Sequence, residues 1–130
     1  MKVLKPILIF IFCLLFSKSV QCQEILNTLP ASIKNGNANA IAKNFDKRVD
    51  ITIDENSDNY SSAQAEVILK GFLGKFSNRD FTIVHKGAST DAAQYAIGNM
   101  KTNSGSYRTY IFIKKSNNIN LIQEIRFEKE

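Results

Sequence analysis

The sequence predicts one α+β domain, in which N-terminal helices pack against an antiparallel sheet. Three observations support this class. Apolar residues early in the mature chain recur at helical spacing, those in the last third alternate with polar residues as in strands, and a helix-capping motif lies between the two regions. The expected order is helix, helix, strand, helix and then a meander of four strands, all within a single domain over residues 23–130.

Residues 1–22 have the layout of a secretory signal peptide. Two lysines precede an apolar run, Ile7 to Phe16, and a polar stretch follows it. The run has about 10 residues, whereas roughly 20 are needed to cross a bilayer core, so a permanent transmembrane helix is the weaker interpretation. Signal peptidases require small residues one and three positions before the cleavage site, and Cys22 and Val20 can occupy these positions. We therefore expect a mature chain that begins at Gln23, lacks a transmembrane anchor and is periplasmic or extracellular.

Cys22 leaves an alternative open, in which the chain is a lipoprotein anchored by a lipid on this residue, although Gln21 is a poor residue to precede such a site. The other cysteine is Cys13, so a cut after Cys22 leaves no thiol for disulfides, metal ligation or nucleophilic catalysis. The cut also removes three basic residues, which leaves 14 against 12 acidic ones and a net charge of +2. This balance does not support nucleic acid as a partner.

Two short helices open the mature chain. Apolar residues recur four positions apart at Ile25, Leu29 and Ile33. This spacing predicts a helix that ends at Gly36 and either starts near Asn27, with Pro30 in its first turn, or kinks at Pro30. Asn37 is the expected N-cap of the second helix. The apolar face of that helix comprises Ala38, Ile41, Ala42 and Phe45.

A strand and a longer helix follow. Apolar and polar residues alternate from Val49 to Ile53, which predicts a strand, and Glu55–Asn59 is expected to be a polar loop. Ser61 and Gln64 form an S-x-x-Q capping box, which predicts a helix from about Ser62 to Phe76. Its apolar face comprises Ala65, Ile68, Leu69, Phe72 and Phe76.

The remaining residues predict a four-stranded antiparallel meander, because alternating segments are separated by short turns. The segments are Phe81–Lys86, Gln94–Lys101, Tyr107–Lys115 and Asn120–Glu128, with turns at Asn103–Ser106 and Asn117–Asn118.

Several stretches together carry a family resemblance: Ile33–Asn37, Tyr60–Val67, Phe76, Val84–Gly87, Tyr95–Gly98 and Tyr107–Tyr110. With them, the chain resembles the DUF4783 family of small secreted proteins typical of Bacteroidetes, within the NTF2-like or cystatin-like superfamily. The resemblance covers essentially all the mature chain. It implies a cone-shaped fold in which the helices pack on a curved sheet, and it implies no established activity and no catalytic residue.

His85 is the only histidine, so one chain cannot supply a two-histidine zinc site. Strict alternation places it on the same face as Phe81 and Ile83, which predicts that it points toward the helices, at the mouth of the cone. There it would act as a general base or contact a ligand, or, as the simpler alternative, satisfy a backbone group near Gly87.

Three tyrosines complete the predicted pocket lining with His85: Tyr95, Tyr107 and Tyr110. Ketosteroid isomerase-like members of the superfamily pair a tyrosine with a buried acid, and the acids on offer are Asp50, Asp80 and Asp91. None of them alternates inward with the apolar set, and a proton-transfer acid needs a dry environment. The sequence therefore assigns no catalytic residue.

Two surface motifs have simple explanations. Asp54–Asp58 opens like a calcium loop, but Asn59 replaces the glycine and Ala65 the bidentate glutamate of that motif, so we expect no metal and no cofactor. A basic cluster surrounds one hairpin: Lys101, Arg108, Lys114 and Lys115. It is either a surface for an anionic polymer or a set of cross-strand partners for Glu124 and Glu128, the simpler account.

The function that these observations favour is that of a secreted, non-catalytic module, which binds a small ligand in the cone or a protein on its sheet, a second copy in a homodimer included. The alternatives are an enzyme that uses His85 with a pocket tyrosine, and a binder of anionic envelope polymer or lipid. A cone filled by Phe72, Phe76, Ile97 and Phe127 would favour a structural role or protein binding, whereas an open pocket that holds His85 and a buried acid would favour the enzyme.

Overall fold

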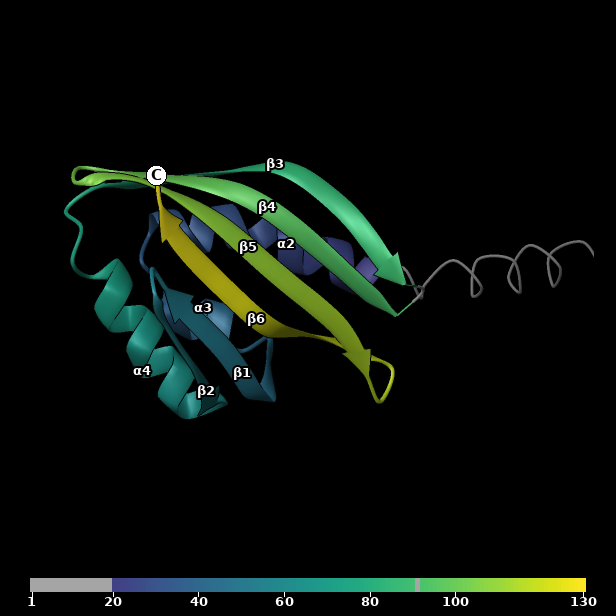
Figure 1. Ribbon diagram of the computed structural model, residues 1–130. Helices are drawn as coiled ribbons and strands as arrows, with labels where there is room; N and C mark the ends of the chain where they lie inside the picture. The colour runs from purple at the N-terminus through teal and green to yellow at the C-terminus, as the bar shows by residue number, and fades with distance from the viewer. Residues whose placement is uncertain (1–19, 91) are drawn as a thin grey trace, which may run out of the picture.

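The computed structural model describes residues 20–90 and 92–130, in which helices cover one face of a sheet (Figure 1). The helices are α2 (Val20–Lys34), α3 (Ala38–Ala42) and α4 (Ser62–Leu73). The strands are β1 (Phe45–Ile53), β2 (Asn56–Ser61), β3 (Arg79–Thr90), β4 (Ala93–Thr102), β5 (Gly105–Ser116) and β6 (Ile119–Lys129). The α+β class and the order of the predicted elements are confirmed. Most of the predicted signal peptide, and Asp91, lie outside the described residues.

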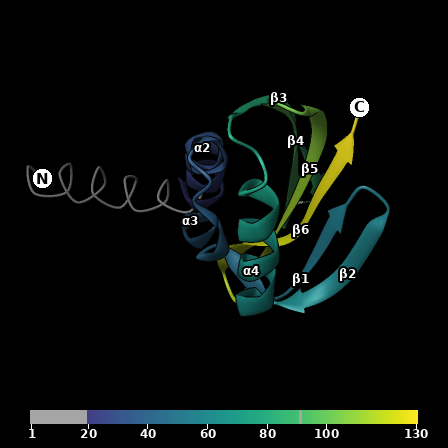
Figure 2. The ribbon, with the colours of Figure 1, turned by 90° about the vertical axis from the view of Figure 1, so that its left-hand side faces the viewer.

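Within the described residues, six strands form one sheet in the order β2-β1-β6-β5-β4-β3. The meander from β3 to β6 is antiparallel as predicted, but β1 runs parallel to β6, so the sheet is mixed. Figure 2 shows α2, α3 and α4 on the same side of the sheet, which curves around them. No helix in the described ranges is long and apolar enough to cross a bilayer.

The stretch expected to be a polar loop belongs instead to a hairpin. The backbone of Asp54 adopts a positive φ of 55° at its turn, and β2 pairs antiparallel with β1 from Asn56 to Ser61. Most of β2 is exposed and polar on both faces, so the strand has no apolar alternation by which it could be found. Asp54 accepts a hydrogen bond from the Lys129 backbone at 3.0 Å, and no metal-binding group of acidic, histidine or cysteine side chains occurs in the described residues.

Local capping fixes the start of α4. The Ser61 hydroxyl accepts from the Gln64 backbone and the Gln64 side chain accepts from the Ser61 backbone, both at 3.3 Å, which confirms the predicted capping box. The helix ends at Leu73, earlier than expected, because Gly74 is its C-cap. In α2, Pro30 lies well inside the helix, so its predicted place in the first turn is wrong.

Aromatic rings fill the space between α4 and the sheet. Phe72 lies 5.3 Å from Phe76, 5.4 Å from Tyr107 and 4.8 Å from Phe127, measured between ring centroids. All four residues are buried. Ile97, expected to fill this space with them, instead lies half-buried on the opposite face of the sheet, where it is paired with Tyr110.

One arginine joins the C-terminal ends of α2 and α4. The Arg79 guanidinium donates four hydrogen bonds of 2.7–3.3 Å to backbone carbonyls. The acceptors are Ile33, Lys34, Leu73 and Phe76. The guanidinium passes close to Gly36, where a Cβ would stand 2.8 Å from Nη2 and the backbone has a φ of 66°, so this turn requires glycine on both counts.

Gly71 offers a position at which stability is expected to rise. It lies on the exposed side of α4, and a Cβ there would meet nothing within 4 Å. We expect Gly71→Ala to stabilise the domain by about 0.5–1 kcal/mol, because alanine loses less conformational entropy in a helix. Urea unfolding measures the change, and an unaltered or lowered midpoint would contradict it.

Candidate functional site

The side of the sheet turned away from the helices, here called the open face, carries three of the four predicted site residues. His85 comes from β3, Tyr95 from β4 and Tyr110 from β5. Their neighbours on alternate positions, such as Ala96 and Ile111, are fully buried against the helices. These three side chains therefore do not line a pocket inside the cone.

A β-bulge explains why the predicted orientation of His85 is wrong. Ile83 pairs with Gly98, but His85 pairs with Ile97, so Val84 is an extra residue in β3. One extra residue reverses the alternation of all that follow. Phe81 and Ile83 therefore face the core, while His85 is exposed on the open face.

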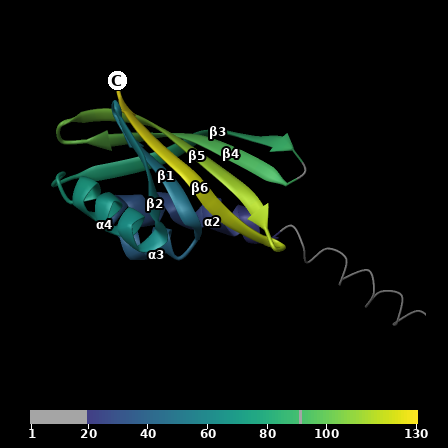
Figure 3. The same ribbon diagram turned by 60° about the horizontal axis from the view of Figure 1, so that its bottom comes forward.

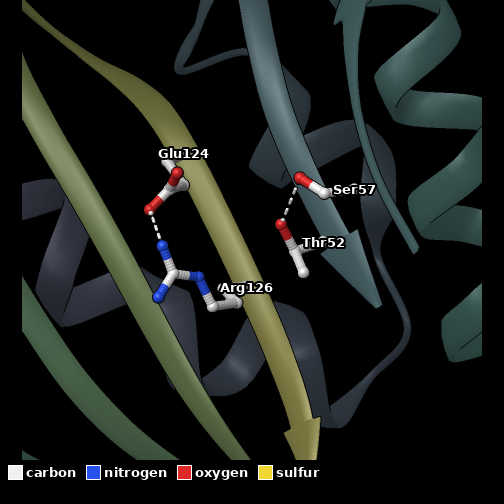
Figure 4. A network of polar contacts seen from close by, with 4 residues as sticks. All are labelled: Thr52, Ser57, Glu124 and Arg126. Carbon is white, nitrogen blue, oxygen red and sulfur yellow. Dashed lines mark hydrogen bonds and ion pairs between the residues drawn. The ribbon is translucent and has the colours of Figure 1, made fainter. Parts of the chain in front are cut away.

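The open face carries a continuous series of contacts across four strands, here called the aromatic row. His85 Nε2 lies 3.3 Å from the Tyr95 hydroxyl, and the Tyr95 ring stacks on Tyr110 at 6.2 Å between centroids and 24° between planes. Arg126 Cζ lies 5.3 Å from the centre of the Tyr110 ring, and its Nη2 donates to Glu124 at 3.0 Å (Figure 4). The row thus joins β3 to β6 through the His85–Tyr95 contact, ring stacking and a cation–π contact, and the ion pair lies within β6.

Gly87 makes room for the row. It pairs with Tyr95, and a Cβ at Gly87 would stand 2.4 Å from the tyrosine ring. The absence of a side chain therefore lets Tyr95 lie across β3 toward His85.

Tyr107, the fourth predicted site residue, belongs to the core. It lies on the helix-covered side in contact with Phe72 and Phe76. Burial raises the pKa of its hydroxyl above the ordinary value of 10.0, and the charge of Asp54 raises it further. The hydroxyl is therefore neutral at physiological pH. Because Tyr107 lies on the helix-covered side of the sheet, it is not part of the aromatic row.

Two of the candidate acids, Asp50 and Asp80, do not contact His85, and Asp91 lies outside the described residues. Asp50 accepts from the Asn59 side chain at 2.8 Å, and Asp80 is exposed and accepts from the Phe81 backbone at 3.1 Å. Within the described ranges, no carboxylate forms a hydrogen bond or ion pair with His85. The described residues therefore supply no acid that orients His85 as a base.

A hollow of about 160 Å³ lies beside the aromatic row, lined by Ile97, Arg108, Tyr110, Arg126 and Glu128. Arg108 and Glu128 are cross-strand partners in register, as the sequence suggests. Glu124, however, pairs with Arg126 of its own strand rather than with the basic hairpin. No ion pair or hydrogen bond of the Arg108 side chain occurs among the described residues.

Two further cavities lie on the outside of the domain. One, of about 250 Å³, lies where α2 begins and is lined by Glu24, Lys43 and Ile119 among others. The other is an apolar hollow of about 440 Å³ between α4 and β2, lined by Tyr60, Ala63, Gln64, Val67 and Ile68. Neither is enclosed by the packed rings of the core.

Comparison with known proteins assigns the chain to a family. A sequence model of a domain of unknown function, DUF4783, matches residues 26–128. The chain belongs to the DUF4783 family. The predicted resemblance is thereby confirmed, and the family brings no assigned function with it. Among curated proteins, none matches this chain.

Solved structures agree with this assignment. A DUF4783 family protein from Bacteroides uniformis is 26% identical, with a TM-score of 0.74 over 80% of this chain and 95% of that chain. A domain of unknown function with a cystatin-like fold from Nostoc punctiforme is 7% identical, with a TM-score of 0.70 over 88% and 78%. Rd1NTF2_04 with long sheet is 12% identical, with a TM-score of 0.66 over 81% and 97%. The last two establish the fold alone, which is NTF2-like and cystatin-like.

Proposed function

We propose that this DUF4783 domain is exported, as its leader predicts, and works as a non-catalytic protein-binding module whose open face binds a second copy of the chain. The observation that carries the proposal is the division between the two faces of the sheet. Rings of Phe72, Phe76, Tyr107 and Phe127 fill the space under α4, whereas the aromatic row is accessible on the open face.

The composition of the open face supports binding to protein. Its centre is formed by half-buried aromatic and aliphatic side chains, including Tyr95, Ile97, Tyr110 and Phe112. Arg126 lies at their edge with a partly exposed guanidinium. Tyrosine and arginine are enriched in protein interfaces, where they supply large contact areas and many donors.

The chemistry of the row argues against the enzyme alternative. His85 is exposed beside a tyrosine, and among the described residues no carboxylate contacts it. General-base catalysis usually needs an orienting group for the base and a stabiliser for the developing charge. Among the described residues, no carboxylate orients His85, so the row is better suited to contact than to proton transfer.

The arrangement of charged side chains on the open face favours a second copy of the chain as the partner. On the open face, β5 presents Arg108 and Tyr110, and β6 presents Glu128 and Arg126 at the same heights along the strands. A two-fold axis along the strands, between β5 and β6, would place β5 of each copy over β6 of the other. Each Arg108 would then face Glu128 of the second copy, and each Tyr110 would face Arg126 of the second copy, so the face is complementary to itself.

The alternative two-fold axis, perpendicular to the strands and level with Tyr110, is unfavourable. It would place Arg126 against Arg126 of the second copy and Glu124 against Glu128, since these residues follow one another along β6. Like charges that meet across an interface cost several kcal/mol. The distribution of charge therefore favours the axis along the strands.

A charge-reversal experiment tests this dimer. We expect the mature chain, residues 23–130, to self-associate in sedimentation equilibrium, and Arg108→Glu or Glu128→Arg alone to raise the dissociation constant at least about tenfold. In a homodimer of either variant, the residues at positions 108 and 128 that face each other would carry the same charge. An equimolar mixture of the two is expected to form a heterodimer, because every reversed group then meets an opposite charge.

Each reversal also changes the charge beside its cross-strand neighbour in the same chain, Arg108 or Glu128. Mixing the variants cannot repair that change, so recovery in the mixture would show that the contact forms between copies. Lys70→Glu is the control, because Lys70 is exposed on α4, on the other side of the sheet. A wild-type chain that stays monomeric up to roughly 1 mM would contradict the dimer, since such a complex would be weaker than about −4 kcal/mol. A mixture whose dissociation constant is no lower than that of either variant alone would also contradict the dimer.

A further inference from the structure

A second surface lies at the end of the domain where the chain enters from the leader. It consists of the part of α2 around Glu24, Lys43, the two lysines at the end of β5 and the tip of the β5–β6 hairpin; we call it the entry end. We propose that the entry end rests on an anionic lipid surface, an inference that does not depend on the dimer.

Several elements meet at this end. Glu24 of α2, Lys43 after α3 and Ile119 at the start of β6 line one cavity, so these parts of the chain are adjacent. Lys115 donates its backbone N–H to the Ala92 carbonyl at 2.8 Å, which brings the start of β4 alongside. Figure 3 shows the start of α2 and the β5–β6 hairpin at the same end of the molecule.

The hairpin turn leaves an apolar residue exposed. Asn117 and Asn118 both have positive φ, of 50° and 63°, the conformation of a tight hairpin turn. Ile119 follows directly and remains 50% exposed. An isoleucine at a hairpin tip is available for insertion into the boundary between lipid headgroups and acyl chains.

Basic side chains flank this isoleucine. Lys43, Lys114 and Lys115 are exposed, and their ammonium groups form no ion pair or hydrogen bond within the described part of the chain. Glu24 is the acidic residue in the adjoining cavity, so positive charge exceeds negative charge among these groups. Each lysine near an anionic membrane surface contributes about 1 kcal/mol of attraction.

While the leader is still attached, its position favours a membrane over a soluble polymer as the partner of the entry end. Residues 17–19 separate the apolar run Ile7–Phe16 from the start of α2 at Val20. Three residues span at most roughly 10 Å when fully extended. Whenever the apolar run lies in a bilayer, or a lipid is attached at Cys22, the entry end is therefore held close to the lipid headgroups.

Vesicle sedimentation tests the proposal with the mature chain, residues 23–130. We expect binding to vesicles of phosphatidylcholine with roughly a third of phosphatidylglycerol, with an association constant on the order of 10³ M⁻¹, and no binding to phosphatidylcholine alone. Lys114→Gln combined with Lys115→Gln is expected to lower this constant about 30-fold. Ile119→Ser is expected to weaken binding independently of charge.

Lys70→Gln combined with Lys75→Gln is the matched control, because it removes the same charge from exposed positions at and beyond the end of α4. Spin-labelled lipid is expected to broaden the amide signals of residues 114–119 most strongly. The proposal would be overturned if the control variant lost as much vesicle affinity as the Lys114 and Lys115 variant, or if the amide signals broadened most strongly outside the entry end. It would also be overturned if Ile119→Ser bound the vesicles as tightly as the wild type and the chain bound soluble dextran sulfate equally well.

Discussion

Phe72→Ala is expected to destabilise the domain by about 3–5 kcal/mol. The Phe72 ring is 4% exposed and contacts the rings of Phe76, Tyr107 and Phe127, so its removal leaves a cavity at the centre of the aromatic cluster. A domain of this size has about 5–15 kcal/mol of stability in total, so the loss is a large share of it. Urea unfolding measures the change.

Val67→Ala is the matched control, since Val67 lies on the same helix and is 68% exposed. It is expected to change stability by less than about 0.5 kcal/mol. If Phe72→Ala costs less than about 1 kcal/mol, the cluster does not support α4 in the way described.

Arg79→Met is expected to cost about 3 kcal/mol, because several helix-terminal carbonyls lose a charged donor at once. The methionine side chain retains much of the packing volume, so the loss reports mainly on the hydrogen bonds. Arg79→Lys is expected to recover only part of it, since a single ammonium cannot reach the ends of both α2 and α4 as the planar fork does.

Urea unfolding again provides the comparison, and hydrogen exchange at the C-terminal turn of α2 locates the effect. Lys75→Met, at an exposed neighbouring position, is the control for loss of charge. Full recovery in Arg79→Lys would show that net charge, rather than the four directed bonds, is what matters at this site.

The elements that follow from local chemistry could be predicted from the sequence. The start of α4 depends on Ser61 and Gln64, which lie three residues apart, and the meander follows from short-range alternation and turns. β2 could not be recognised, because an edge strand that is polar on both faces has no hydrophobic period.

The candidate site could be predicted only in part, because a single bulge decides the orientation of His85. Alternation through Val84 gave the wrong face, and no residue type marks that position as a bulge. Tyr107 and Tyr110 lie three residues apart on β5, so regular alternation places them on opposite faces, and only Tyr110 belongs to the open face. The sequence does not indicate the role of Arg79, because its acceptor at Ile33 lies 46 residues away along the chain.

The parallel pairing of β1 with β6 has a consequence for the order in which the chain folds. β6 comes last in the chain among the six described strands, yet it lies between β5 and β1 and forms hydrogen bonds with both. The β1–β2 hairpin therefore cannot join the rest of the sheet until the residues up to Lys129 have been added. A chain that lacks β6 cannot complete its sheet, so the pairing of β1 with β6, which lie far apart along the chain, is expected to form late in folding.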